Sequence, residues 1–270
     1  MAGADADGRD GGPAGAALSA VNCRAPRRGL VAYLVAGIGT LNENPLHAGL
    51  KDWFRRPGDA VEAPVAGFVA DLLRGDELIE IQTAGFSSLA RKLDHLLDHH
   101  RIRVVHPIAA EKWILEIDDA GARISRRKSP LRGIAADVCA ELVSFPSLLS
   151  HPNFVLVVAL VQEEEVRQAD PSVRRRRGWA VRERRLLKVV ETLELGSPES
   201  LHQLLPPGLP DPFRTSDLAD ALGRPRHLAR QVAYCLREAE ALEVDGRDRD
   251  GIVYRRPRSI QTSAVPRSSP

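Results

Sequence analysis

A predicted two-residue turn at Gly75-Asp76, within "GFVADLLRGDELIEIQT", constrains the fold more than any other feature of this sequence. Gly at the first central position is typical of a tight β-hairpin turn, and an apolar run flanks the turn on each side. Counting outwards from the turn places Asp71 opposite Glu80. Side chains alternate between the two faces of a strand, so Gln82 is predicted to share the face of Glu80.

Two carboxylates that face each other across a hairpin need a compensating positive charge, because like charges directly opposite each other destabilise a sheet. A cation bound between Asp71 and Glu80 removes that penalty, and Mg²⁺ prefers such oxygen ligands. The alternative is that both acids face solvent and pair with nearby basic side chains, for which the candidates are Arg74, Arg91 and Lys92. Both interpretations stay open at this point.

The composition is that of a soluble globular protein with one or two cores. Of the 270 residues, 43% are hydrophobic and 27% are charged. The formal net charge is only +2, so any basic surface for nucleic acid has to be local. Cys23, Cys139 and Cys235 lack metal-ligand spacing and are interpreted as reduced thiols of a cytoplasmic protein. The apolar run after Arg28 is too short to span a bilayer and no cleavage site is evident, so we expect neither membrane insertion nor export.

Hydrophobic periodicity predicts an α/β (α+β) fold in two folded parts. The first, residues 29–166, is predicted to begin with a helix, a meander of three strands, a second helix and a strand. The predicted segments are 41–54, 60–65, 67–74, 77–83, 86–100, 101–109, 112–118, 134–149 and 153–166. An Arg-rich linker at 167–178 and a C-terminal domain at 179–256 are expected to follow. Residues 1–28 and 257–270 are expected to be a disordered leader and tail.

The predicted elements follow the order helix, three strands, helix, strand. The second strand carries an acid, and the third carries an acid-x-polar pattern. Over residues 38–117 this arrangement resembles the restriction-endonuclease-like PD-(D/E)XK nuclease superfamily. The resemblance implies a metal-dependent nuclease in which Asp71 and Glu80 bind Mg²⁺ or Mn²⁺. It also implies a third residue, usually Lys, that positions or activates the attacking water. Gln82 stands at that position, a departure that some restriction enzymes share. Glu43 matches a further acid that superfamily members often carry on the first helix, and a homodimer on duplex DNA is an expectation of the same kind.

Phosphodiester hydrolysis suits these residues on chemical grounds as well. A metal polarises the phosphoryl oxygen and lowers the pKa of a bound water. The amide of Gln82 does not titrate near neutral pH, so it would orient water through hydrogen bonds. Lys92, on the next predicted helix, could add positive charge near a phosphate. The competing hypothesis is a non-catalytic DNA-binding or regulatory protein whose nuclease-like fold is a relic, and Gln82 favours it.

The segment "DHLLDHH" suggests a second metal hypothesis, because His95 and His99 are four residues apart on a predicted helix. No third ligand is specified nearby, so a solvated helix end is the preferred interpretation.

Residues 179–256 resemble a winged helix-turn-helix domain, with a first helix at 181–195, the short helix "SDLADAL", a turn at Gly223 and a long helix started by Pro225. The hairpin "EVDGRDRDGIVYRR" would be the wing. In that family the long helix enters the major groove of DNA. The positions implied to contact DNA are Arg224, Arg226, His227, Arg230 and Gln231.

The linker arginines are predicted to add sequence-independent phosphate contacts; they are Arg174, Arg175, Arg176 and Arg177. The predicted wing gives the opposite signal, because it carries three aspartates among its arginines. Winged helices also serve as protein–protein modules, so an adaptor that contacts no nucleic acid is a third hypothesis.

Overall fold

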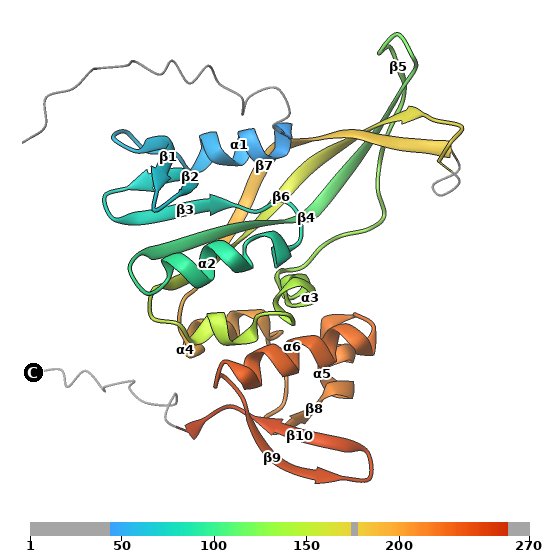
Figure 1. The fold of residues 1–270 in the computed structure, drawn as a ribbon. Helices are drawn as coiled ribbons and strands as arrows, with labels where there is room; N and C mark the ends of the chain where they lie inside the picture. Colours follow the sequence, from blue (N-terminus) through green and yellow to red (C-terminus); the bar gives the residue numbers. More distant parts are fainter. Residues whose placement is uncertain (1–43, 174–177, 259–270) are drawn as a thin grey trace, which may run out of the picture. The chain divides into compact units, whose positions relative to one another are not determined.

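The structure, a computed structural model, describes residues 44–173 and 178–258 (Figure 1). Its elements are α1 (Pro45–Phe54), β1 (Ala60–Val65), β2 (Phe68–Arg74), β3 (Glu77–Ile81), η1 (Phe86–Ser88), α2 (Ala90–Leu96), β4 (Arg101–Ile117), β5 (Arg123–Lys128), η2 (Ala135–Val138), α3 (Cys139–Leu142), η3 (Pro146–Ser150), β6 (Phe154–Ala169), β7 (Trp179–Leu195), α4 (Pro198–Leu201), η5 (His202–Leu204), β8 (Phe213–Arg214), α5 (Thr215–Leu222), α6 (Arg226–Glu238), β9 (Glu243–Asp248) and β10 (Gly251–Arg255). This is a mixed α+β structure with a core that is mostly sheet. The predicted leader, 1–28, lies outside the described residues, as does the predicted tail apart from 257–258.

The large sheet has the strand order β1-β2-β3-β4-β6-β7, and β5 pairs with the outer part of β4. β3 runs parallel to β4, and β4 runs parallel to β6, whereas the other neighbouring strands recorded in this sheet are antiparallel. α2 connects β3 to β4, since parallel neighbours need a crossover rather than a tight turn. The predicted order of helix, three strands, helix and strand is confirmed.

Helices cover both faces of the inner part of the large sheet (Figure 1). On one face, Leu46 and Leu50 of α1 pack in a cluster with Ile79 of β3. On the other face, Leu93 of α2 packs in a cluster with Leu78 of β3. The neighbouring residues of β3 therefore point into opposite clusters, as the pleat of a strand requires.

The start of α1 follows the sequence prediction. Asn44 caps the helix, because its Oδ1 accepts a hydrogen bond from the backbone nitrogen of Leu46 at 3.1 Å, and Pro45 occupies the first turn. This start places His47 and Lys51 one helical turn apart, on the same side of α1.

The outer halves of β4, β6 and β7 project past the helices together with β5, at the upper right of Figure 1. We call this part the arm and define it as residues 111–128, 162–169 and 179–185. The character of β6 changes where it enters the arm. Val157 and its neighbours are buried aliphatic residues, whereas buried glutamates such as Glu165 follow further along.

The predicted helix at 181–195 is wrong, because these residues lie in β7, which pairs along its length with β6. β6 itself continues to Ala169, so the predicted linker at 167–178 begins inside a strand. Residues 179–195 accordingly belong to the large sheet. The spacing of the apolar residues in this segment suits a helix, but β7 is the last strand in the sheet order and most of it is not buried. Strict alternation of apolar and polar residues is therefore not required of it.

Two further elements differ from prediction. The strands predicted at 101–109 and 112–118 form the single strand β4, with an irregularity in its pairing to β6 between Ala109 and Glu111. The helix predicted at 134–149 is divided into η2, α3 and η3. Pro146 begins η3, since proline is tolerated in a first turn and ends a helix elsewhere.

The C-terminal part contains α5, α6 and a small sheet of order β8-β10-β9. Gly223 ends α5 in the left-handed conformation, with φ 61°, and Pro225 directly precedes α6. The two helices predicted here are confirmed. α6 contacts α3 through two buried free thiols, since Cys235 Sγ donates to the carbonyl oxygen of Cys139 at 3.8 Å. The C-terminal part thus shares an apolar cluster with the large sheet. Within the described ranges, no helix is long and apolar enough to cross a membrane.

Candidate functional site

The hairpin of β2 and β3 has the predicted register. Arg74 pairs with Glu77 across the turn, and the next two pairs follow the same count. The regular pairs stop there, one residue before Asp71 and Glu80. Beyond them the side chain of Asp71 bridges the two strands, because its Oδ2 accepts a hydrogen bond from the backbone nitrogen of Ile81 at 2.7 Å. Asp71 and Glu80 are close enough for the charge of Asp71 to act on the pKa of Glu80.

α1 contributes two basic groups to the surroundings of Asp71. His47 Nε2 lies 3.2 Å from Asp71 Oδ2. Burial acts to raise the pKa of Asp71, but the hydrogen bonds from His47 and the Ile81 backbone and the charge of Lys51 together lower it below its ordinary value. Asp71 is therefore an anchored, ionised carboxylate at neutral pH.

α2 contributes the cation beside Glu80. Lys92 Nζ lies 2.5 Å from Glu80 Oε1 and also donates to the carbonyl oxygen of Val69 at 2.5 Å. Glu80 is only 6% exposed. This burial raises its pKa above the ordinary value, the charge of Asp71 acts in the same direction, and Lys92 opposes both. The two acids are thus shifted in opposite directions, a pattern found in acid–base sites.

β1 adds a third carboxylate at the rim of the site. The register of β1 and β2 places Glu62 opposite Asp71, and Lys51 Nζ lies 3.3 Å from Glu62 Oε1. Glu62 has φ 51°, a left-handed backbone conformation that is uncommon for residues other than glycine. We call the side chains of His47, Lys51, Glu62, Asp71, Glu80 and Lys92 the acid cluster.

Gln82 lies outside the acid cluster, contrary to the prediction that it stands beside the two acids. Its Nε2 donates to the carbonyl oxygen of Gly85 at 2.7 Å and to Ser88 Oγ at 3.0 Å. β3 ends at Ile81, so the alternation of a regular strand no longer sets the direction of the following side chain. The loop after β3 holds the amide of Gln82, whereas Lys92 of α2 supplies the cation beside Glu80.

The other residues that the sequence suggested for this site have different positions. Glu43 lies outside the described residues. Arg74, an alternative partner for the acids, instead pairs with Asp59 at 2.7 Å. The histidine pair is not held on one helix, because α2 ends at Leu96, before His99.

The donor set of the acid cluster suits a hard divalent cation. In the described ranges, no group of three or more His, Cys, Asp or Glu side chains is arranged to hold a metal ion. Asp71 and Glu80 nevertheless fit Mg²⁺, which uses one or two carboxylates together with waters and substrate phosphates. Because Lys92 already contacts Glu80 Oε1, a bound ion would share Glu80 with this lysine or displace it.

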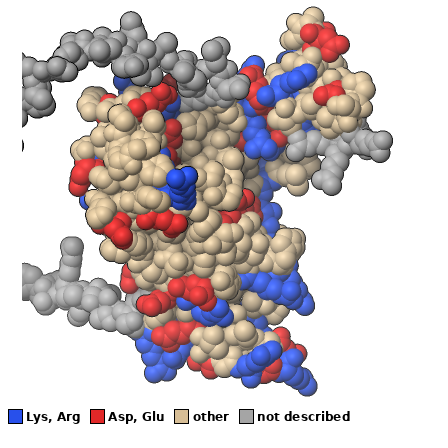
Figure 2. Space-filling view, in the orientation of Figure 1, with Lys and Arg blue, Asp and Glu red and all other residues tan. Residues whose placement is uncertain are grey.

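α6 presents most of the residues that the sequence assigned to DNA contact. Arg226, His227 and Arg230 are exposed, and Gln231 is half-buried. Sequence analysis missed Tyr234, which is 38% exposed and extends the line of Arg226 and Arg230 by another four residues. Helical spacing alone could have identified it. Figure 2 shows basic and acidic residues interspersed over the lower, C-terminal part of the view.

Arg224 is not free for DNA, contrary to the prediction. It donates to the backbone carbonyl of Arg132 and lies 3.4 Å from Asp137 Oδ2, so it ties the turn between α5 and α6 to the rest of the molecule. Arg174, Arg175, Arg176 and Arg177 lie outside the described residues.

Comparisons with known proteins agree with the extent of the large sheet. The family described as "Domain of unknown function (DUF8091)" matches residues 44–196, from the cap of α1 to one residue after β7. An "Uncharacterized protein" of Treponema pallidum (strain Nichols) is 29% identical over 235 residues, which is 86% of this chain and 93% of that relative. No solved structure matches the chain. Since the family match covers more than half of the sequence and includes the whole acid cluster, the chain belongs to the DUF8091 family.

Proposed function

We propose that this protein hydrolyses phosphodiester bonds in DNA with a divalent metal at Asp71 and Glu80, and that α6 delivers it to DNA. The observation that carries the proposal is the convergence of the acid cluster. Two acids on neighbouring strands meet Lys92 from one face of the sheet and His47 from the other. The order of α1, the β1–β3 meander, α2 and β4, which resembles the PD-(D/E)XK arrangement, adds support.

Each residue of the cluster has a role that its contacts support. A divalent ion, once bound, supplies Lewis acidity and a water of lowered pKa. Lys92 places a fixed positive charge where negative charge develops on the phosphoryl group. His47 orients Asp71 through its hydrogen bond. Glu80 would be the second ligand of the ion, beside Asp71.

The C-terminal part supports contact with DNA. The order β8, α5, α6, β9, β10 resembles a winged helix-turn-helix, and α6 exposes basic residues near its start. Two acids of the β9–β10 hairpin are already paired within the molecule. Asp248 pairs with Arg214, and Asp245 lies 3.4 Å from Arg255. Because these pairs offset two negative charges, the hairpin repels phosphate less than its sequence suggests.

A second candidate function is DNA binding without catalysis. The specific observation in its favour is the contact between Lys92 and Glu80, which gives the buried acid a partner without any metal. Gln82 carries no positive charge, and its amide is held by the loop, so it cannot take over the role of Lys92 if that lysine stays paired with Glu80.

Incubation of the purified protein with plasmid, single-stranded DNA and RNA, with Mg²⁺, Mn²⁺ or chelator, separates these two functions. We expect metal-dependent nicking that Asp71→Asn or Glu80→Gln abolishes and that Lys92→Met lowers by about 10²-fold or more. Asp76→Asn is the matched control, since it removes an exposed acid from the turn of the same hairpin. Equal activity in the Asp71 and control variants, or no cleavage of any substrate, would contradict the nuclease proposal.

Duplex binding tests the role of α6 independently of cleavage. Arg226→Ala with Arg230→Ala should weaken binding, by roughly 1–3 kcal/mol for each good contact with a base that the substitutions remove. Arg55→Ala with Arg101→Ala removes equal charge from exposed sites outside the C-terminal part. Binding measured in chelator as a function of salt should fall for the first pair and change little for the second. If wild-type protein fails to bind duplex even at low salt, α6 is a protein-contact helix instead.

A further inference from the structure

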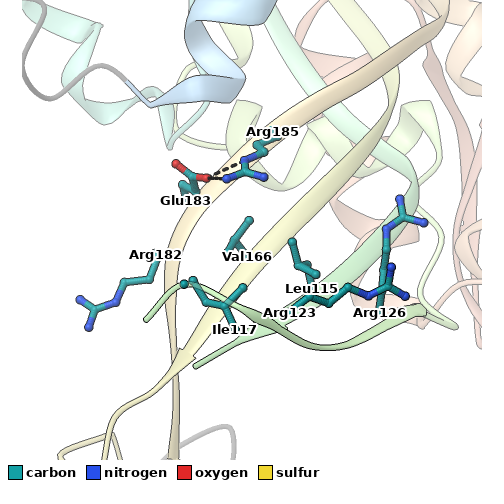
Figure 3. Close-up of a pocket in the computed structure, with 9 residues that line it drawn as sticks. Leu115, Ile117, Arg123, Arg126, Val166, Arg182, Glu183 and Arg185 are labelled. Atoms are coloured by element: carbon teal, nitrogen blue, oxygen red, sulfur yellow. Dashed lines mark hydrogen bonds and ion pairs between the residues drawn. The ribbon is translucent and has the colours of Figure 1, made fainter. Parts of the chain in front are cut away.

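The arm contains a hollow of about 520 Å³ on one face of its sheet (Figure 3). Its floor is apolar and consists of Leu115, Ile117 and Val166. The strand pairings explain this floor. Leu115 of β4 is the registered partner of Val166 of β6, so the side chains of both point to the same face.

Arginines stand on both sides of this floor, as Figure 3 shows. Arg123 and Arg126 come from β5, whereas Arg182 and Arg185 come from β7. The hollow is therefore an apolar strip between two cationic edges. None of these residues belongs to the acid cluster or to α6.

Two of the four arginines are fixed by protein contacts. Arg126 Nε donates to the buried carboxylate of Glu164 at 2.7 Å, and its guanidinium lies 4.3 Å from the ring centroid of Trp113. Arg185 pairs with Glu183 and lies 3.8 Å from the carboxylate of Glu164. One buried carboxylate thus helps to position an arginine on each edge of the hollow.

The other two arginines form no ion pair within 4 Å in the described part of the chain. Arg182 is exposed and donates to the neutral Gln168 Oε1 at 2.7 Å, and its charge is near enough to Asp170 to help lower the pKa of that carboxyl. Arg123 is exposed and has no recorded hydrogen bond or ion pair among the described residues. Four arginines against Glu164 and Glu183 leave a net positive hollow, so its charge complements an anion.

We propose that the hollow of the arm binds a segment of single-stranded nucleic acid. Such a strand combines an anionic backbone with flat apolar bases, and single-strand sites combine cationic grooves with stacking surfaces. The arginine edges suit the phosphates, and the apolar floor with the stacked Arg126–Trp113 pair suits the bases. A duplex presents its bases stacked inside, so it would leave the apolar floor unused. This inference adds a strand-binding surface to the proposed nuclease function, but it does not depend on cleavage.

The test compares two double variants of the full chain that remove the same charge. Arg123→Gln with Arg182→Gln removes one positive charge from each edge of the hollow. Arg127→Gln with Arg101→Gln is the control, because both side chains are exposed and Arg127 pairs with Ile114, on the opposite face of the arm from Leu115. Binding of a fluorescein-labelled oligothymidylate is followed by anisotropy in chelator, over a series of salt concentrations.

We expect the hollow variant to bind oligothymidylate at least tenfold more weakly than wild type, and the control variant to bind within about twofold of wild type. The slope of log affinity against log salt should fall by about 1.4, or about 0.7 for each of two phosphate contacts on a single strand. Unchanged melting temperatures of both variants exclude a folding effect.

Four outcomes overturn the proposal: no wild-type binding at low salt, equal losses in both variants, a loss seen only with blunt duplex, or binding of a polyglutamate peptide in place of oligothymidylate. The Arg226→Ala with Arg230→Ala variant separates this inference from the proposed function. It should lose duplex binding and keep oligothymidylate binding. If it instead loses oligothymidylate binding as fully as the hollow variant does, the strand lies on α6 and the assignment to the arm is wrong.

Discussion

Two sets of buried carboxylates lie on the same sheet and differ in how many cations surround them. In the acid cluster, Glu80 has Lys92 as its ion-pair partner and also lies near the charge of Asp71, and its pKa is raised. In the arm, Glu165 is 2% exposed, like the deepest residues of the core. Among the described residues, Lys112, Arg167 and Arg184 place cationic groups within 4 Å of it, and its pKa is lowered despite its burial.

The difference concerns how fully each set of acids is compensated within the described part of the chain. A buried charge is tolerated when partners compensate it, and it is costly when they do not. Glu165 has these partners within the chain. Among the described residues, Asp71 and Glu80 divide three basic neighbours between two acids, and one of these, His47, is charged only when protonated. An added divalent cation would therefore gain more at the acid cluster than at Glu165.

The largest expected effect is on stability. Glu165→Ala leaves its cationic neighbours without their shared partner and should lower the free energy of unfolding by roughly 3 kcal/mol. Glu80→Gln should change it by less than about 1 kcal/mol, because it relieves the repulsion from Asp71 while it removes the ion pair with Lys92. Urea unfolding measures both, with Glu191→Ala as an exposed control on β7. A larger loss for Glu80→Gln than for Glu165→Ala would reverse the comparison.

The next largest effect is a rise in melting temperature on addition of a divalent metal, which should depend on the acid cluster and not on the glutamates of the arm. A ligand that binds only the folded state stabilises it by about 2.7 kcal/mol at a concentration of 100 Kd. Mn²⁺ or Mg²⁺ should therefore raise the melting temperature of wild-type protein and of Glu163→Gln, since Glu163 pairs with Lys112 in the arm. The shift should disappear in Asp71→Asn with Glu80→Gln. A shift that persists in this double variant would place the metal elsewhere.

The two sets should also respond oppositely to pH. Because the pKa of Glu80 is raised, the folded state keeps a proton that the unfolded chain releases near pH 4.5. The free energy of unfolding therefore falls as pH rises from 4.5 through the folded pKa of Glu80. The lowered pKa of Glu165 means that its contribution is present above 4.5 and is lost as pH falls through the folded pKa. Relative to wild type, Glu80→Gln should gain stability as pH rises from 4.5 through the folded pKa of Glu80. Glu165→Gln should lose stability relative to wild type as pH rises from the folded pKa of Glu165 to 4.5, so at higher pH the two variants differ from wild type in opposite directions. Departures of the same sign would contradict the assigned shifts.

The smallest effect tests the boundary of the acid cluster. Gln82→Ala removes two hydrogen bonds to the loop at 85–88 and should cost about 1 kcal/mol of stability. The metal-dependent shift in melting temperature should stay as in wild type, because the amide has no recorded contact with Asp71 or Glu80 among the described residues. Loss of that shift would bring Gln82 back into the site.

Much of the candidate site was predictable because its signals are local. A turn at 75–76 between apolar runs sets the register of β2 and β3, and that register places Asp71 beside Glu80. The direction of Gln82 was not predictable, because the strand ends one residue earlier and the loop captures the amide. Lys92 could be named from the sequence as a source of charge, but only the packing of α2 on the sheet brings its ammonium to Glu80.

Elements whose causes lie within a few residues could be predicted from the sequence: the capped start of α1, the β2–β3 hairpin, and the α5–α6 turn at Gly223. The strand at 181–195 could not, because it depends on pairing with a distant segment. That segment has a spacing compatible with a helix, and its pairing with β6 selects the extended form. The same holds for the arm, whose buried glutamates gain their cationic partners only when the strands come together. Local backbone preferences act between neighbours along the chain, whereas burial and charge compensation depend on partners that folding alone supplies.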